Sequence, residues 1–301
     1  MNDYKKLGIY QSFIKSKLWS TKANIFFHVY EEIFQKFRNK EIIFVEIGVK
    51  RGGSLLMWRD WLGPKARIIG IDLDPNAKKL EEHGFEIFIG DQSSPDFWSH
   101  FFKTVGNVDI ILDDGAHTNE AQIITTINCI NHINDGGLLV IEDAISSFEK
   151  KFFNPQKYSF LNYSKSLIDD IFVRCLKGKT KEKFKKKISL NDKIYSIKFF
   201  SDFVVFEINR LKCIDREGLQ NKDLNDNSYD KITTDELNYI NPRWSTDSYK
   251  GVLAKFIYYL SKVFFFMRYI PFSKHLSKKI IFFKGKYYNK KISAKLKKYF
   301  E

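Results

Sequence analysis

The sequence predicts an α/β fold built on a mostly parallel β-sheet, and three observations carry this prediction. Five short apolar runs alternate with stretches of helical periodicity between residues 41 and 141. Glycines and acidic residues directly follow several of these runs, where the strands would end. Two further β-rich runs lie on either side of residues 201–202. Strands that alternate with helices at this spacing pair in parallel through right-handed crossovers.

The elements follow in order along the chain. Residues 1–40 have apolar positions at helical spacing, with Ser20 or Thr21 as the predicted N-cap. Residues 42–47 (IIFVEI) form a short apolar run that ends at Gly48, which is typical of a buried strand. The other parallel strands are predicted at residues 67–73, 85–89, 108–112 and 137–141. The alternating helices are predicted at residues 52–62, 76–83, 95–104 and 119–133.

The second half of the chain is less regular. A helix is predicted for residues 163–176, and residues 193–209 predict an antiparallel hairpin that completes a seven-stranded sheet. The chain is thus expected to divide into four parts. These are an N-terminal helical segment (1–40), the α/β domain (41–210), a polar linker (211–249) and a basic, aromatic helical tail (250–301).

Positive charge is concentrated in the tail. The net charge is +14, and residues 250–301 hold thirteen lysines, one arginine and a single acid. Apolar residues such as Leu296 and Tyr299 recur there at helical spacing among the lysines, a pattern typical of an amphipathic helix on an anionic membrane surface. The alternative is that a first helix, over residues 253–267, packs on the core and a second, over residues 288–299, is a solvated face. Residues 256–272 are interrupted by charges and a proline, so no membrane span is expected.

Cysteine content and the N-terminus indicate the compartment. The three cysteines form no C-x-x-C motif, and their odd number argues against a disulfide framework. The N-terminal residues contain no apolar signal sequence. We therefore expect a cytoplasmic protein, with the tail as a potential contact to the inner membrane face.

The first strand–helix loop contains candidate ligand-binding residues, in the segment 46–54 (EIGVKRGGS). Its glycines let a ligand approach the backbone. The spacing differs from the G-x-G-x-x-G of dinucleotide-binding loops, and Glu46 would repel a pyrophosphate. Glu46 would instead balance a ligand that carries an amino group and a sulfonium. A tight turn without a ligand is the alternative.

Acidic and polar residues also follow the second and third strands. Asp72 comes 26 residues after Glu46, where a carboxylate can accept both hydroxyls of a ribose. An N-cap is the alternative role, but Asp74 can supply that cap instead. Asp91 and Gln92 follow the third strand and can bond an adenine amino group, or can simply form a turn.

The densest polar cluster follows the fourth and fifth strands. Residues 113–117 (DDGAH) end the fourth strand, and Glu142 and Asp143 end the fifth. Ligands of open α/β sheets bind at this edge, and carboxylates this close together need a cation or a proton. Hard oxygen ligands suit Mg²⁺ or Ca²⁺. Helix capping is the alternative, although five polar groups exceed what capping requires.

In this order, VEIGVKRGGS, GIDLDP, GDQS, DDGAH and the late IED resemble class I S-adenosylmethionine-dependent methyltransferases. More narrowly, they resemble the metal-dependent sugar O-methyltransferases of the macrocin O-methyltransferase family and their cephalosporin-hydroxylase-like relatives. The similarity runs from about residue 20 to residue 209 and implies a Rossmann-like fold. Two departures stand out. Residues 20–22 are Ser-Thr-Lys where relatives often have Thr-Asp-Lys, and the segment after Asp143, expected to contribute to the acceptor pocket, matches poorly.

The resemblance also implies roles for individual residues. It places Mg²⁺ on Asp114, Glu142 and Asp143, and makes His117, beside Asp114, the catalytic base. The implied S-adenosylmethionine-binding residues are Glu46, Gly48, Gly52, Ser54, Asp72, Asp91, Gln92 and Asp113.

The implied reaction is methylation of a sugar hydroxyl in glycan or natural-product biosynthesis. A vicinal diol of the sugar would chelate Mg²⁺, and His117 would take the proton of one hydroxyl. A purely structural His117 is the alternative for that residue.

Two other hypotheses remain open for the whole protein. The same fold can methylate a phenol, an amine or an RNA, and the basic tail favours RNA among these. A non-catalytic protein that binds a membrane surface or another anion is the second hypothesis, against which the acidic cluster argues. Contacts in a homo-oligomer are compatible with either.

Overall fold

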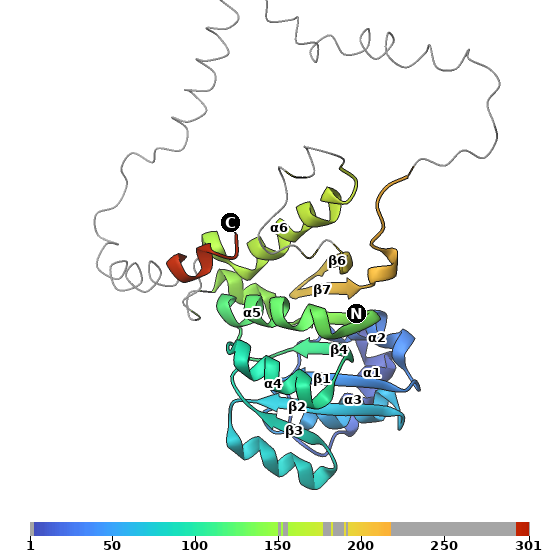
Figure 1. Ribbon diagram of the computed structural model, residues 1–301. Coiled ribbons are helices and arrows are strands. Elements are labelled where there is room, and N and C mark those ends of the chain that lie inside the picture. Colours follow the sequence, from blue (N-terminus) through green and yellow to red (C-terminus); the bar gives the residue numbers. More distant parts are fainter. Residues whose placement is uncertain are drawn as a thin grey trace, which may run out of the picture. The chain divides into compact units, whose positions relative to one another are not determined.

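The computed structural model describes residues 3–149, 152, 156–176, 182, 190, 192–217 and 293–300. Seven strands in this part of the chain form one sheet in the order β3-β2-β1-β4-β5-β7-β6 (Figure 1). The strands are β1 (Ile42–Ile47), β2 (Ala66–Asp72), β3 (Glu86–Ile89), β4 (Val108–Asp113), β5 (Ile133–Ile141), β6 (Ile194–Phe200) and β7 (Phe203–Ile208). β1 to β5 are parallel, whereas β7 runs antiparallel to β5 and to β6. The predicted mostly parallel, seven-stranded sheet with a terminal hairpin is confirmed.

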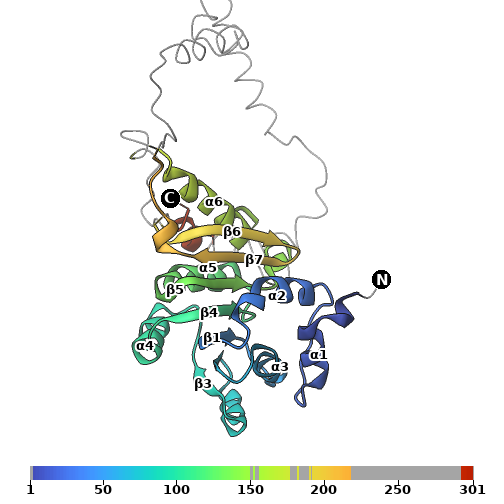
Figure 2. The same ribbon diagram turned by 90° about the vertical axis from the view of Figure 1, so that its right-hand side faces the viewer.

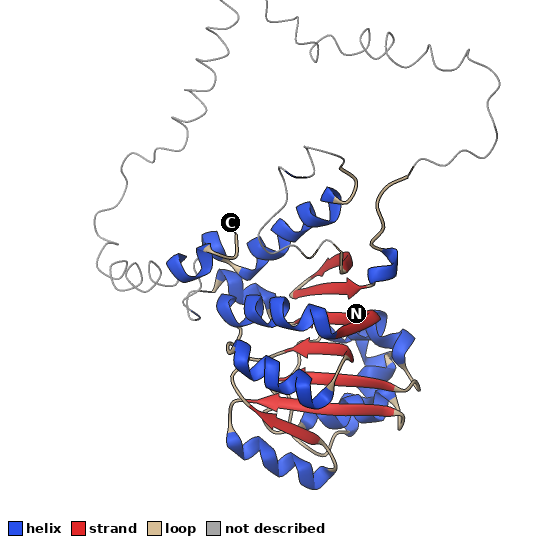
Figure 3. Cartoon of the chain, in the orientation of Figure 1, coloured by secondary structure: helices blue, strands red, loops and turns tan. Residues whose placement is uncertain are grey.

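In the described part of the chain the helices α1 to α6 connect or flank the strands; Figure 3 draws them, together with the 3-10 helices, in blue. They are α1 (Gly8–Lys15), α2 (Phe26–Phe34), α3 (Gly53–Leu62), α4 (Pro95–Val105), α5 (Asn119–Cys129) and α6 (Phe160–Val173). The helix predicted at residues 76–83 is a 3-10 helix, η3 (Pro75–His83), which Asp74 caps by accepting a hydrogen bond from the Asn76 amide. None of the helices in the described part combines the length and hydropathy of a membrane-spanning segment.

Both faces of the sheet are covered, so its central strands are apolar throughout. Phe44 of β1 packs with α2 and α3 on one face, whereas its neighbour Val45 packs with α4 and α5 on the other. The same alternation recurs at Leu138 and Leu139 of β5. Figure 2 shows α1 and α3 on one side of the sheet and α4 on the opposite side. Burial on both faces explains why these strands read as continuous apolar runs.

The N-terminal segment is helical only in part. α1 ends at Lys15 and α2 begins at Phe26, so the predicted N-cap at Ser20 or Thr21 is wrong. The chain between the two helices passes over the start of α3, where Ser16 Oγ donates to the carbonyl of Gly53 (2.9 Å). A Cβ on Gly53 would lie 2.6 Å from the Trp19 carbonyl oxygen, so only glycine permits this approach. Contacts with α3 therefore outweigh the helical periodicity of this stretch.

The last described residues return to the same domain. Leu296 is fully buried in the hydrophobic cluster under α5 and α6, and Lys295 pairs with Glu120 of α5. The ring of Phe300 contacts Tyr158 and Tyr163 at centroid distances of 5.3 and 5.9 Å. The apolar side of the described part of this helix thus packs on the core, which differs from both expectations for it, a membrane surface and a solvated face. The predicted linker from residue 218, and the tail up to residue 292, lie outside the described residues.

Candidate active site

Sheet register brings the ends of four strands to one edge. Ile47 of β1 pairs with Ile71 of β2 and with Asp113 of β4, and Asp113 pairs with Ile141 of β5. The loops continue this alignment, because the Asp114 amide donates to the Ile47 carbonyl (3.0 Å). The residues that follow each strand therefore meet, and they line two adjoining cavities.

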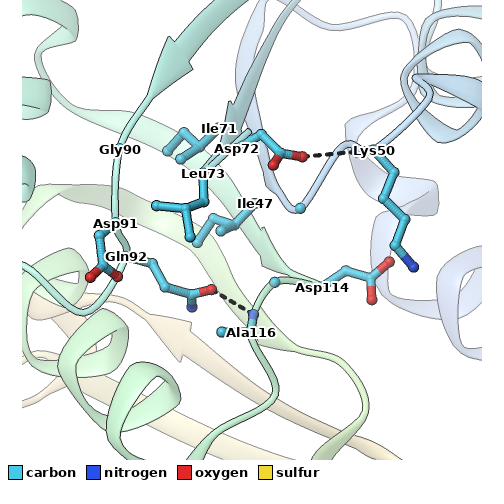
Figure 4. A pocket seen from close by; sticks show the side chains of 12 residues that line it. Ile47, Lys50, Ile71, Asp72, Leu73, Gly90, Asp91, Gln92, Asp114 and Ala116 are labelled. Atoms are coloured by element: carbon cyan, nitrogen blue, oxygen red, sulfur yellow. Dashed lines mark hydrogen bonds between the residues drawn. The ribbon is translucent and has the colours of Figure 1, made fainter. Parts of the chain in front are cut away.

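The first cavity measures about 210 Å³ and lies over the ends of β1, β2 and β3 (Figure 4). Both oxygens of Asp72 accept backbone hydrogen bonds, from the amides of Lys50 and Asp74, at 2.9 Å each. These bonds fix the carboxylate at the cavity wall. Leu73 also lines the cavity, and its apolar side chain is 70% exposed. The full lining is Ile47, Gly48, Lys50, Ile71, Asp72, Leu73, Gly90, Asp91, Gln92, Asp114, Gly115 and Ala116.

Gln92 anchors the floor of the first cavity. Its amide nitrogen donates to both oxygens of Asp113 (3.0 and 2.9 Å), and its amide oxygen accepts from the Ala116 amide (2.8 Å; Figure 4). Asp113 is buried, lines neither cavity and also accepts from the Gly115 amide. Burial raises the pKa of Asp113 above its usual value, although these hydrogen bonds oppose the shift. The pair thus holds the loop after β4 in position.

Gly48 separates the first cavity from the second. Its φ is +88°, and a Cβ there would lie 2.2 Å from the carbonyl oxygen of Asp114. Any larger residue would therefore push apart the loops that follow β1 and β4. Gly48, Lys50 and Asp114 line both cavities, so the two spaces meet at this point.

The second cavity measures about 310 Å³ and draws on five distant segments of the chain. Its lining comprises Trp19, Ser20, Thr21, Lys22, Ala23, Phe26, Gly48, Val49, Lys50, Ser54, Asp114, His117, Glu142, Asp143 and Asp202. Five non-glycine residues of the described chain have a positive φ, and four of them line this cavity: Lys50, His117, Asp143 and Asp202. Backbone strain of this kind gathers at functional sites.

Asp202 belongs to the turn between β6 and β7 and supports this cavity from the far end of the sheet. It accepts hydrogen bonds from the amides of Ala144 (3.0 Å, to its carbonyl) and Ile145 (2.8 Å, to its carboxylate). The predicted hairpin therefore fixes the backbone that follows Asp143.

Three side chains in the second cavity converge as metal ligands would. One ligand atom each from Asp114, His117 and Asp143 lies within 4.8 Å of the others. His117 Nε2 is 3.4 Å from Asp143 Oδ2 and 3.9 Å from Asp114 Oδ1. Burial raises the pKa of the Asp143 carboxyl. Glu142, the third predicted ligand, lines the cavity but points to other partners.

Glu142 faces a buried lysine that sequence reasoning did not select. Lys22 Nζ lies 2.6 Å from Asp114 Oδ2 and 3.0 and 3.2 Å from the two Glu142 oxygens. The hydroxyl of Tyr30 donates to Glu142 Oε2 (2.6 Å). Burial alone would lower the pKa of Lys22, but Asp114 and Glu142 outweigh it and raise the pKa well above its usual value. Lys22 is therefore a cation inside the cluster.

Glu46 lies beneath this cluster, fully buried, and lines neither cavity. Its Oε2 accepts from Ser54 Oγ (2.8 Å), whereas its Oε1 is 4.0 Å from Lys22 Nζ and accepts no hydrogen bond from the described residues. Burial raises the pKa of Glu46 to about 7.

The predicted site residues thus fall into three groups. Asp72, Asp91 and Gln92 line the first cavity, and Gly48 and Asp114 line both. Ser54, His117, Glu142 and Asp143 line the second. Glu46, Asp113 and Gly52 lie behind the cavity walls, with Gly52 at the N-cap of α3. The prediction missed Lys22, Tyr30 and Trp19; the Ser-Thr-Lys at residues 20–22 was the available signal for Lys22 alone.

Comparisons with known proteins agree with this geometry. Residues 45–144 match a family described as a methyltransferase domain. Mycinamicin VI 2''-O-methyltransferase of Micromonospora griseorubida is 34% identical over 155 residues, which cover 47% of this chain and 38% of the relative. Demethylmacrocin O-methyltransferase of Streptomyces fradiae is 32% identical over 155 residues, with the same coverage. The matched region thus spans about two fifths of these relatives.

A solved structure extends the likeness beyond the matched sequence. The MycE methyltransferase of the mycinamycin biosynthetic pathway, solved in complex with Mg and SAH, superposes with a TM-score of 0.60 and 25% identity. The superposition covers 73% of this chain and 56% of that one. The chain therefore contains a class I S-adenosylmethionine-dependent methyltransferase domain, and its relatives include O-methyltransferases that act in the mycinamicin and macrocin series.

Proposed function

We propose that this protein transfers a methyl group from S-adenosylmethionine to a sugar hydroxyl, with the help of a divalent metal ion. The observation that carries the proposal is the junction of the two cavities at Gly48, Lys50 and Asp114. A donor in the first cavity and an acceptor in the second would meet beside Asp114. Holding two reactants in such an orientation supplies much of the rate enhancement of a transfer reaction.

The first cavity suits S-adenosylmethionine. The carboxylate of Asp72 would accept hydrogen bonds from the ribose hydroxyls, and Asp91 would bind the adenine side; the backbone bonds that fix Asp72 at the cavity wall support this. Leu73 and Ile71 offer apolar surface that a planar base would cover. Behind the wall, the Glu46 carboxylate provides negative charge for a ligand that carries a sulfonium and an amino group. MycE, with 25% identity, was solved with SAH, the product form of this cofactor.

The second cavity suits a divalent ion. Carboxylate oxygens of Asp114 and Asp143 lie within 4.8 Å of each other, close to the roughly 4 Å between ligand atoms on opposite sides of Mg²⁺. Carboxylate oxygens are the donors that Mg²⁺ and Mn²⁺ prefer. A rotation of Glu142 would bring in the third carboxylate of the predicted set. An ion held here would lower the pKa of an acceptor hydroxyl.

The residues of the chain then have separable tasks. His117 accepts the proton of the acceptor hydroxyl. At the same time the hydroxyl oxygen bonds to the methyl carbon, and the bond between that carbon and the sulfur of S-adenosylmethionine breaks. Asp143 lies 3.4 Å from the His117 imidazole and orients it. Trp19 lines the same cavity with an indole that is 55% exposed, and it offers an apolar face to a sugar ring.

Within this proposal the acceptor is a small-molecule sugar or a glycan, and the reaction takes place in the cytoplasm. A further relative from Streptomyces olivaceus, 29% identical over 153 residues, is an 8-demethyl-8-alpha-L-rhamnosyl tetracenomycin-C 2'-O-methyltransferase, and its rhamnosyl acceptor supports a sugar acceptor here. Contact of the basic tail with an anionic membrane surface remains part of the proposal for residues 250–292, ahead of nucleic acid or a second copy of the chain.

The proposal is tested by calorimetry and by a methyl-transfer screen. We expect S-adenosylmethionine to bind, and tritiated methyl to be transferred to rhamnosides, nucleotide sugars or lipid-linked glycans, with more product in Mg²⁺ than in EDTA. Absence of S-adenosylmethionine binding would overturn the enzyme hypothesis. Transfer to RNA or phenols alone would keep the enzyme and reject the sugar acceptor.

A further inference from the structure

Lys22 occupies the position that a second cation would take beside the proposed metal ion. Three carboxylates surround its ammonium group, at 2.6 Å (Asp114), 3.0 Å (Glu142) and 4.0 Å (Glu46). Its side chain is only 2% exposed. Carboxylates this close together repel one another strongly unless a cation lies between them. Among the described residues, Lys22 supplies that cation.

Asp114 divides its two oxygens between Lys22 and the ligand cluster. Oδ2 accepts the hydrogen bond from Lys22, whereas Oδ1 lies toward His117, at 3.9 Å from Nε2. Glu142 is held away from the cluster in the same manner, with Lys22 on both oxygens and Tyr30 on one. Lys22 therefore determines which carboxylate oxygens face the space between Asp114, His117 and Asp143.

Lys22 reaches the site from outside the matched methyltransferase region, which begins at residue 45. The preceding chain is held against α3 by the bonds of Ser16 and by the close approach of Trp19 to Gly53. α2, which follows, carries Tyr30. The N-terminal segment is thus built to deliver one positive charge into the acidic cluster.

We propose that Lys22 is a built-in cation of the active site, a positioning residue that orients Asp114 and Glu142 and weakens the attraction of the site for divalent ions. This inference rests on the proposed metal site. As a consequence, the site binds a single, exchangeable metal ion, because the Lys22 side chain already fills the adjacent cation position.

The test is Mn²⁺ binding, followed through the electron paramagnetic resonance signal of free Mn²⁺, in the full-length protein. Lys22→Met removes one positive charge next to the metal and should tighten Mn²⁺ binding about tenfold. Lys22→Arg keeps the charge and should bind Mn²⁺ as the wild type does. Lys103→Met is the matched control, because Lys103 is exposed and lines neither cavity. Its charge is screened, so the affinity should change less than twofold.

Folding is followed by circular dichroism and by S-adenosylmethionine binding. If Lys22→Met does not fold, Lys22→Gln removes the same charge while it still donates to Glu142, and the same tightening is expected. Unchanged or weaker Mn²⁺ binding in folded Lys22→Met or Lys22→Gln would overturn the inference and leave the proposed function standing. A wild type that binds S-adenosylmethionine but no Mn²⁺ would overturn both the inference and the metal part of the proposed function.

Discussion

The two cavities are built in different ways. The first is lined by loops that each follow a strand directly, and its fixed groups are held mainly by backbone amides. The second combines the N-terminal segment, three strand ends and the turn of the hairpin, and it depends on side-chain charge pairs. A motif can specify the first cavity locally, whereas the second exists only when distant segments have assembled. Single substitutions in the first cavity should therefore lower the affinity for S-adenosylmethionine, whereas single substitutions in the second cavity should lower the turnover of the enzyme.

The largest effect is expected at Asp143. Asp143→Asn removes a charged ligand from the cluster, so metal-stimulated turnover should fall by about 10³-fold. Turnover is measured in Mg²⁺ and in EDTA, together with the affinity for S-adenosylmethionine. Asp91→Asn is the matched control in the first cavity. It should lower the affinity for S-adenosylmethionine but leave the ratio of turnover in Mg²⁺ to turnover in EDTA unchanged. Full turnover of Asp143→Asn would remove the metal from the mechanism.

His117 should show the next largest effect. His117→Gln keeps a polar side chain but removes the base, so kcat should fall by about 10²- to 10⁴-fold. The affinity for S-adenosylmethionine should not change, because His117 does not line the first cavity. A loss of S-adenosylmethionine affinity with an unchanged kcat would contradict the separation of the two cavities.

A smaller effect is expected at Asp72. Asp72→Ala should weaken S-adenosylmethionine binding by about 1–3 kcal/mol, because a charge-assisted contact to the ribose is lost. Asp74→Ala provides the comparison, since Asp74 caps η3 and bonds only locally. It should lower the melting temperature while calorimetry finds the same affinity. Equal affinities for wild type and Asp72→Ala would mean that the ribose lies elsewhere.

Glu46 should make cofactor binding depend on pH. Its pKa is about 7 because the group is buried, and only the ionised form favours a cationic ligand. Affinity for S-adenosylmethionine should therefore rise by roughly tenfold between pH 6 and pH 8. Glu46→Gln should bind with little dependence on pH over this range. A pH-independent wild type would show that Glu46 does not sense the ligand.

The same pKa shift affects stability in the opposite direction. The folded pKa of Glu46 lies above the unfolded value of 4.5, so the folded state retains its proton to higher pH. The contribution of Glu46 to stability is therefore greatest below pH 4.5 and declines as the pH rises toward 7.

The smallest effect is expected at Trp19. Trp19→Ala should raise the KM for the sugar acceptor several-fold at an unchanged kcat, whereas Trp19→Phe keeps an aromatic face and should stay near the wild type. Initial rates at varied acceptor concentration make the distinction. An equal change in both variants would indicate that the indole only supports the loop.

The sequence predicted the sheet and the first cavity because both depend on local pattern. The apolar runs gave five parallel strands, and Asp74 took the capping role that left Asp72 for a ligand. Lys22 could not be found in this way, because 92 and 120 residues separate it from Asp114 and Glu142. The N-cap at Ser20 or Thr21 failed for the same reason, since contacts with α3 decide where α2 begins. Tertiary contacts across such separations leave no periodic signal in the sequence.

Because Leu296 is buried, deleting the tail would change the stability of the domain as well as any membrane binding of the tail. Residues 293–300 pack on the α/β domain, so this end of the tail is part of the core. A truncation after Thr246 would also remove Leu296, and the loss of a buried leucine costs about 2–5 kcal/mol. If that truncated protein failed to float with liposomes, the loss of membrane binding could not be distinguished from damage to the core. An internal deletion that keeps residues 293–300 avoids this, because Leu296 then stays in the core.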